Sequence, residues 1–214
     1  MRDANKKKID TVLCHRLVDA LEKRWIKGYY AENKEEALKI ALELIPEGSS
    51  IGYGGSVTID SLGLKDALDN EKYHLIRREL AKTPEEMREK YIEIYGSDVF
   101  ITSANAITED GIIVNIDGNG NRVSAISFGP RKVIFVVGVN KIAKDLDAAM
   151  QRARNVAAPA NCVRVGVTET PCQTAGSCLN CLNPKTICSE FLVTRCNKLP
   201  DRMHVIVVNE ELGY

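Results

Sequence analysis

The sequence has no excess of charge of either sign, because its 29 lysines and arginines equal its 29 aspartates and glutamates. This balance argues against binding to nucleic acid or to an anionic membrane surface. No run of about 18 apolar residues occurs, so we expect no membrane span. Met1 leads into a polar, lysine-rich stretch without an apolar core. We therefore expect no signal peptide and a cytoplasmic protein.

The sequence also has no internal repeat and no low-complexity linker. Its 214 residues are enough to bury a sizeable core without disulfides. We expect one domain over residues 1–214, with a helical N-terminal segment at residues 1–28 and a cysteine-rich insertion at residues 168–200. Nothing in the sequence decides whether the chain forms a homo-oligomer.

Periodicity predicts an α/β fold. Apolar residues at every fourth position indicate an N-terminal helix that ends near Gly28, and Thr83, Pro84 and Glu86 have the chemistry of a helix start. A further helix is expected from Asn140. Predicted strands lie at residues 29–31, 50–53, 73–77, 98–102, 112–116, 132–138, 163–167 and 204–208. Since strands and helices alternate, we expect a mostly parallel sheet flanked by helices.

Three glycine-containing loops follow predicted strands, where ligands bind in open α/β sheets. The first holds Gly54, Gly55, Ser56 and Thr58. Glycines let backbone N–H groups approach an anion, and the two hydroxyl groups add donors. These four residues are candidates for binding a phosphate, a carboxylate or a nucleotide. The alternative is an ordinary tight turn.

The second loop follows a buried strand and holds Ser103, Asn105 and Glu109. Ser103 and Asn105 are candidate ligand-binding residues. Glu109 is the candidate catalytic residue, as a nucleophile or a general base in a partly desolvated position. The alternative for Glu109 is a solvated carboxylate in a turn.

The third loop holds Asp117, Gly118, Asn121 and Arg122, which are also candidate binding residues. Asp117 and Asn121 offer polar partners for a ligand, and Arg122 offers a guanidinium for an anion. The loop does not complete a dinucleotide-binding motif, because Val123 stands where the third glycine would be. The alternative is a glycine turn between two elements.

Four cysteines are closely spaced near the end of the chain. Cys172, Cys178, Cys181 and Cys188 read C-x5-C-x2-C-x6-C, and thiolates at such spacing bind zinc or an iron–sulfur cluster. The spacing selects neither cofactor, and redox-active thiols or inert reduced cysteines are the alternatives. We expect Cys196 to fall outside the four-ligand set.

We expect Cys162 and Cys14 to be packing residues, since Cys162 lies close in sequence to a predicted strand and Cys14 lies beside the apolar stripe of the first predicted helix.

Three stretches resemble the LUD (lactate-utilization) domain family. They are GYGGSVTIDSLGL at residues 52–64, DVFITSANAITEDGIIVNIDGNGNRVSAISFGPRKVIFVVGVNKI at residues 98–142, and VNEELGY at residues 208–214. The chain is similar to the short, stand-alone form, in which a cysteine segment follows the last long helix. The resemblance implies a fold similar to that of CoA transferases and ribose-phosphate isomerase.

The resemblance also implies a function in organic-acid metabolism of the lactate-utilization type, with a small anionic or nucleotide-like ligand. Two other functions stay open. One is an electron-transfer or assembly subunit that carries a metal or an iron–sulfur cluster and works with iron–sulfur oxidoreductase partner subunits. The other is a CoA-transferase-like enzyme, because Glu109 occupies a Glu-x-Gly turn similar to that of the nucleophile in those enzymes.

Overall fold

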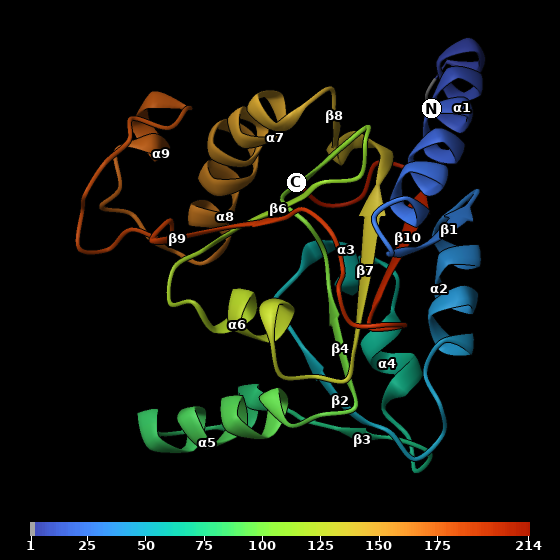
Figure 1. Ribbon diagram of the computed structural model, residues 1–214. Helices are drawn as coiled ribbons and strands as arrows, with labels where there is room; N and C mark the ends of the chain where they lie inside the picture. The colour runs from blue at the N-terminus through green and yellow to red at the C-terminus, as the bar shows by residue number, and fades with distance from the viewer. Residues whose placement is uncertain (1–2) are drawn as a thin grey trace.

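A parallel sheet of six strands forms the centre of the molecule (Figure 1). The structure is a computed structural model and describes residues 3–214, so the expected polar start at Met1 lies outside the described residues. Strand β7 pairs with both β10 and β4 and therefore lies in the middle. In spatial order the strands are β1 (Lys27–Ala31), β10 (Met203–Val208), β7 (Lys132–Gly138), β4 (Val99–Thr102), β2 (Ser50–Tyr53) and β3 (His74–Leu75).

A second, smaller sheet of mixed direction lies beside the first. Its order is β8 (Ile142–Ala143), β5 (Ala106–Thr108), β6 (Ile113–Asp117) and β9 (Glu190–Thr194). Two connections pass from the large sheet to the small one: residues 103–105 join β4 to β5, and residues 139–141 join β7 to β8. Because β4 pairs with β7 and β5 pairs with β8, these two connections run next to each other.

Helices cover both faces of the large sheet. One face packs against α2 (Lys34–Glu43), α3 (Val57–Ser61) and α4 (Leu64–Leu68). The other packs against α1 (Ala4–Glu22), α5 (Pro84–Tyr95), α6 (Asn121–Ser127) and residues of the small sheet. In residues 3–214 no helix is both long enough and apolar enough to cross a bilayer.

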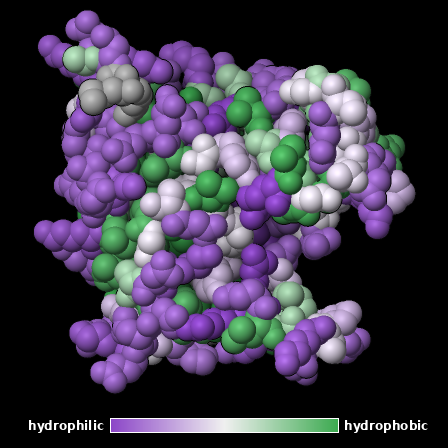
Figure 2. Space-filling view, turned by 180° about the vertical axis from the view of Figure 1, so that it is seen from behind, coloured by the Kyte–Doolittle hydropathy of each residue, from purple (hydrophilic) through white to green (hydrophobic). Residues whose placement is uncertain are grey.

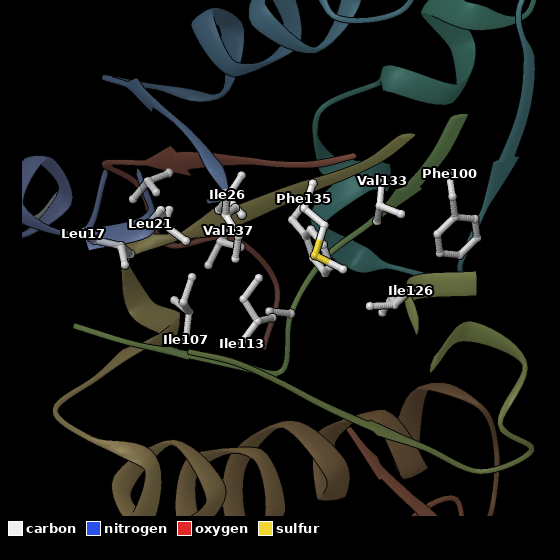
Figure 3. Close-up of a cluster of buried hydrophobic side chains, with 14 of the residues drawn as sticks. Leu17, Leu21, Ile26, Phe100, Ile107, Ile113, Ile126, Val133, Phe135 and Val137 are labelled. Carbon is white, nitrogen blue, oxygen red and sulfur yellow. The ribbon is translucent and has the colours of Figure 1, made fainter. Parts of the chain in front are cut away.

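Alternate side chains of β7 explain this layering. Phe135 and Val137 point into the core shared with Leu17 of α1 and Ile113 of β6 (Figure 3). Val136, between them, points into the core on the other face. Both faces of the strand are therefore buried, as its continuous apolar sequence predicts. The expected α/β fold with a mostly parallel sheet flanked by helices is confirmed.

A helical segment covers the small sheet. It consists of α7 (Leu146–Arg152), a π-helical turn (Ala153–Ala157) and α8 (Ala158–Arg164), and a short helix, α9 (Cys172–Ala175), follows. Ala149 and Ala153 pack against Val114 and Ile116 of β6. The small side chains let the helix lie close to the sheet. In Figure 1 these elements form the upper left part of the molecule.

The start predicted for this helix is wrong. Residues 139–141 form a 3₁₀ turn and residues 142–143 pair with β5, so α7 begins only after Asp145. The Asp145 carboxylate accepts a hydrogen bond from the Ala148 N–H at 2.9 Å and caps the helix. Polar Asn140 resembled a cap in the sequence, whereas its amide side chain instead contacts the backbone of Leu212 and Gly213.

One further expectation is wrong. Residues 163–167, predicted as a strand, form the end of α8 and a turn, and Val163 and Val165 are exposed rather than buried in a sheet. The segment 168–200 also contains a strand that was not predicted, β9, which pairs with β6 over five residues on each side. Its apolar positions alternate too weakly to show a strand in the sequence.

A capping prediction concerns α5, which positions the cavity residue Tyr91. The Thr83 hydroxyl accepts a hydrogen bond from the Glu86 N–H at 3.1 Å, and the Glu86 carboxylate accepts one from the Lys82 N–H at 2.6 Å. We expect Thr83→Ala to lower the free energy of unfolding by about 1 kcal/mol, measured by urea denaturation. Thr83→Ser keeps the acceptor and should lose much less. Equal losses in both variants would contradict a capping role.

Candidate functional site

A cavity of about 370 Å³ lies where three neighbouring strands of the large sheet, β2, β4 and β7, reach their carboxyl ends. The loop after β6, the end of α8 and the last residues of the chain complete its wall. Seen from behind, the outline of the molecule is indented between the lower part, which holds α5, and the upper part, which holds α7 to α9 (Figure 2). Because residues after β2, β4 and β7 line the cavity together with the end of β6, its walls come from both sheets.

Gly54 and Gly55 make room for arginine side chains in this wall. A Cβ atom on Gly55 would lie 3.0 Å from Nη2 of Arg78 and 3.5 Å from Nη2 of Arg164. One on Gly54 would lie 3.4 Å from Cδ of Arg122. The side chains of three arginines thus lie close to the same glycine turn.

Lys141 lies at the bottom of the cavity, in the 3₁₀ turn after β7, and is only 3% exposed. Its ammonium group donates hydrogen bonds to the hydroxyl groups of Thr58 at 2.9 Å and Ser103 at 3.0 Å. Neither partner is a carboxylate. Burial, together with the charges of Arg152 and Arg122, lowers the pKa of Lys141 to about 7. The amine can therefore gain or lose a proton near neutral pH.

Arg122 is fixed by a set of oxygen atoms. Its guanidinium donates to the Asn105 side-chain oxygen at 3.0 Å and to the Ile116 carbonyl. The Asp117 carboxylate accepts a hydrogen bond from the backbone N–H of Arg122 at 2.8 Å and lies 3.9 Å from its Nε atom. With its side chain 18% exposed, Arg122 is held in one orientation and still faces the cavity. Burial lowers its pKa, and Asp117 opposes this effect.

The other side of the cavity carries two more arginines. Arg78 donates to the Tyr91 hydroxyl at 2.8 Å, and Arg164 donates to the Asn161 side-chain oxygen at 2.8 Å. The lining therefore contains four basic side chains, Arg78, Arg122, Lys141 and Arg164, and one acidic side chain, Asp117. This excess of positive charge, surrounded by hydroxyl and amide groups, suits an anion.

The structure brings all ten of the predicted binding residues to this one cavity. They are Gly54, Gly55, Ser56, Thr58, Ser103, Asn105, Asp117, Gly118, Asn121 and Arg122. Their roles in binding stay predictions. The loops after the parallel strands β2 and β4 converge as expected, whereas the third loop follows β6, an antiparallel strand, and reaches the cavity from the small sheet.

Sequence reasoning missed Lys141, Arg78, Arg164 and Tyr214, which also line the cavity. A signal existed for Lys141, because it follows strand β7 in the same way that Ser103 follows β4. The helix expected from Asn140 obscured it. Arg78 and Arg164 come from a 3₁₀ turn and from α8, and no local pattern marks them.

Glu109 lies outside this cavity. It follows β5, which carries the chain away from Asn105 by about 13 Å. Its carboxylate, 20% exposed, pairs with Lys144 at 3.0 Å and Arg16 at 3.4 Å. The structure therefore does not place Glu109 with the ten predicted binding residues, and its catalytic role stays a prediction.

The predicted metal ligands lie along the side of α7 and α8. Cys188 packs against the surface formed by Ala149 and Ala153, and Cys178 donates its backbone N–H to Asn155 at 3.1 Å. Within residues 3–214, no three side chains of His, Cys, Asp or Glu are already arranged to hold a metal ion. The loop nevertheless reaches the cavity, because Ile187 is part of its wall.

Comparisons with known proteins place the chain in a family. The profile of the LUD domain matches residues 14–208. A DUF162 family protein from Deinococcus radiodurans has a similar fold, with a TM-score of 0.55 at 17% identity over 93% of this chain and 98% of that one. Ribose 5-phosphate isomerase A from Neisseria gonorrhoeae reaches a TM-score of 0.35 at 21% identity over 53% of this chain and 54% of that one.

No curated protein matches the sequence. The family profile covers most of the chain, and the Deinococcus structure shares its fold over nearly all of it. The chain belongs to the LUD domain family.

Proposed function

We propose that this protein binds a small anionic ligand in the cavity at the strand ends and acts in organic-acid metabolism of the lactate-utilization type. The observation that carries the proposal is the lining, in which Arg78, Arg122, Arg164 and Lys141 outnumber the one acidic side chain, Asp117. Guanidinium groups bind carboxylates and phosphates through paired hydrogen bonds. The lactate-utilization association of the LUD family supports an organic acid, either free or joined to a nucleotide-like carrier.

Lys141 gives the cavity a group for proton transfer. The pKa of Lys141 is about 7 in the protein without ligand, and an anion beside the amine favours its charged form, which can act as a general acid. In the proposed complex Arg122 and Arg164 bind the anionic group, and the Lys141 ammonium group contacts it as well.

A binding panel tests the proposal. The whole protein is titrated calorimetrically with hydroxy acids, sugar phosphates and CoA esters, and we expect saturable binding to at least one class. The matched control is Arg131→Ala, because that arginine is 86% exposed and lies outside the cavity, so its removal should leave the affinity unchanged. Absence of saturable binding across the panel would overturn the proposal.

A substitution at Glu109 separates this proposal from the CoA-transferase alternative. Because Glu109 lies outside the cavity, Glu109→Gln should change the affinity for the anion by no more than about twofold. If the protein instead transfers acyl groups through Glu109, hydroxylamine will trap an acyl adduct on it and the variant will lose turnover. The adduct is sought by mass spectrometry of the trapped peptide.

A further inference from the structure

Five cysteines that lie apart in the sequence gather beside α8. Cys162, on α8 itself, has its sulfur 3.8 Å from that of Cys172 on α9. Burial raises the pKa of Cys162, and the nearby Cys172 and Cys181 add to this effect while Thr170 opposes it. Burial, together with the neighbouring Cys162, Cys178 and Cys172, raises the pKa of Cys188 to about 11. The other thiols of the loop therefore lie near enough to the Cys162–Cys172 pair to influence its electrostatics.

The distance between Cys162 and Cys172 fits a shared metal ion. Two sulfur atoms that bind one tetrahedral zinc ion at about 2.3 Å each lie about 3.8 Å apart. The two cysteines carry free thiols and are much farther apart than the sulfur atoms of a disulfide. Cys162 is a buried residue of α8, and Cys172 belongs to the short helix α9. The Cys172 thiol donates a hydrogen bond to the Cys162 sulfur, which holds the two sulfur atoms at the separation of a shared site.

The turn from Cys178 to Cys181 has the features of a metal-binding C-x2-C turn. Asn180 has a positive φ of 52°, and its backbone N–H donates to the Cys178 sulfur at 3.4 Å. Arg154 donates to the same sulfur at 3.5 Å and also holds the Asn180 side chain at 2.8 Å. Donors of this kind surround metal-bound thiolates and orient them.

We propose that Cys162 and Cys172 bind a soft divalent metal ion of the zinc class, and that two of the three loop cysteines Cys178, Cys181 and Cys188 complete the site. Cys162 thus takes a ligand position that the spacing of the last cysteines does not reveal. Cys196 is excluded, because it lies beyond β9 next to Asn197, which binds the backbone of Arg24 and Trp25.

Binding requires a modest closure of the loop. The segment between α8 and β9 has one short helix and few backbone hydrogen bonds, so it can bring a third and a fourth sulfur to the fixed pair. Each thiol that binds releases its proton to water, and no oxidation takes place. The affinity should therefore rise with pH.

Metal titration of the reduced whole protein tests the proposal. Protein is purified without oxygen, stripped of metal and titrated with Co²⁺, whose tetrahedral thiolate complexes absorb strongly, and then with Zn²⁺ against a chromophoric chelator. We expect one equivalent to bind. Cys162→Ser and Cys172→Ser should each weaken Zn²⁺ binding by more than about 100-fold, while Cys196→Ser should bind as the unchanged protein does.

Folding is checked separately, because Cys162 is buried. Circular dichroism and thermal unfolding without metal show whether Cys162→Ser keeps its structure, and the half-buried Cys172 offers a variant with less risk. Binding by a folded Cys162→Ser protein at unchanged affinity would overturn the proposal. So would absence of Co²⁺ absorption in the unchanged protein, or a Cys162–Cys172 disulfide in the anaerobic preparation. No anionic ligand is needed, so this test and the ligand panel fail independently.

Discussion

Arg122→Met is expected to weaken binding of the anionic ligand by about 100-fold, since it removes charged hydrogen bonds worth about 3 kcal/mol. Methionine fills much of the same space but donates no hydrogen bond. Asn105 and the Ile116 carbonyl then lose their donor, and Asp117 faces the ligand without its cationic neighbour. The loss of attraction and the new repulsion act in the same direction.

The measurement is a calorimetric titration with the best ligand from the panel. Arg122→Lys is the matched variant, because it keeps the charge but not the paired donors. Its affinity should lie between those of the unchanged protein and of Arg122→Met. Thermal unfolding checks that both variants fold. Unchanged affinity in a folded Arg122→Met protein would show that the anion binds elsewhere.

Lys141 is expected to make binding depend strongly on pH. Its pKa is lowered to about 7, so the free protein carries a neutral amine above that pH. An anion in contact with the amine favours the charged form, and binding therefore takes up a proton. Above pH 7 the affinity should fall by about tenfold per pH unit, until the pH reaches the pKa of Lys141 in the complex.

Sulfate suits this measurement because its charge does not change over the range. Titrations at pH 8 in buffers of different ionisation enthalpy should show uptake of close to one proton. Lys141→Met removes the titrating group, so its affinity should be weak and nearly independent of pH. The same slope in that variant would assign the proton to another group.

Without ligand, a rise in pH has the opposite effect on folding: it increases stability, whereas it weakens ligand binding. Between pH 7 and the ordinary lysine value of 10.5, the unfolded chain holds a proton on Lys141 that the folded chain lacks. The contribution of Lys141 to the free energy of unfolding therefore rises with pH across this window.

The fold could be predicted from local pattern because its central strands are apolar on both faces. Phe135 and Val136 point to opposite cores, and such a strand is recognisable without knowing its neighbours. The small sheet was harder to predict. Its strands are short, and β9 becomes a strand only through pairing with β6, which lies more than 70 residues earlier.

The residues of the site differ in the same way: some could be predicted from local sequence pattern, and others are placed only by the tertiary fold. Arg122 lines the cavity, but it follows β6, an antiparallel strand of the small sheet and not a strand of the parallel sheet. Loops at the ends of neighbouring parallel strands converge, so Ser56 and Ser103 could be placed together from sequence. Arg164 could not, because its position depends on the path of α8 over the small sheet. Cys162 is similar: its closeness to Cys172 results from the turn after α8, which was predicted as a strand.

The two adjacent connections between the sheets have a mechanical consequence. Residues 103–105 and 139–141 run side by side, and the Lys141–Ser103 hydrogen bond joins them at 3.0 Å. Arg122 follows the small sheet and Gly55 the large one, so the cavity lies across the line where the two sheets meet. An anion bound by both sides would join the sheets a second time, through its own contacts. Occupied protein should therefore resist proteolysis better than the empty protein.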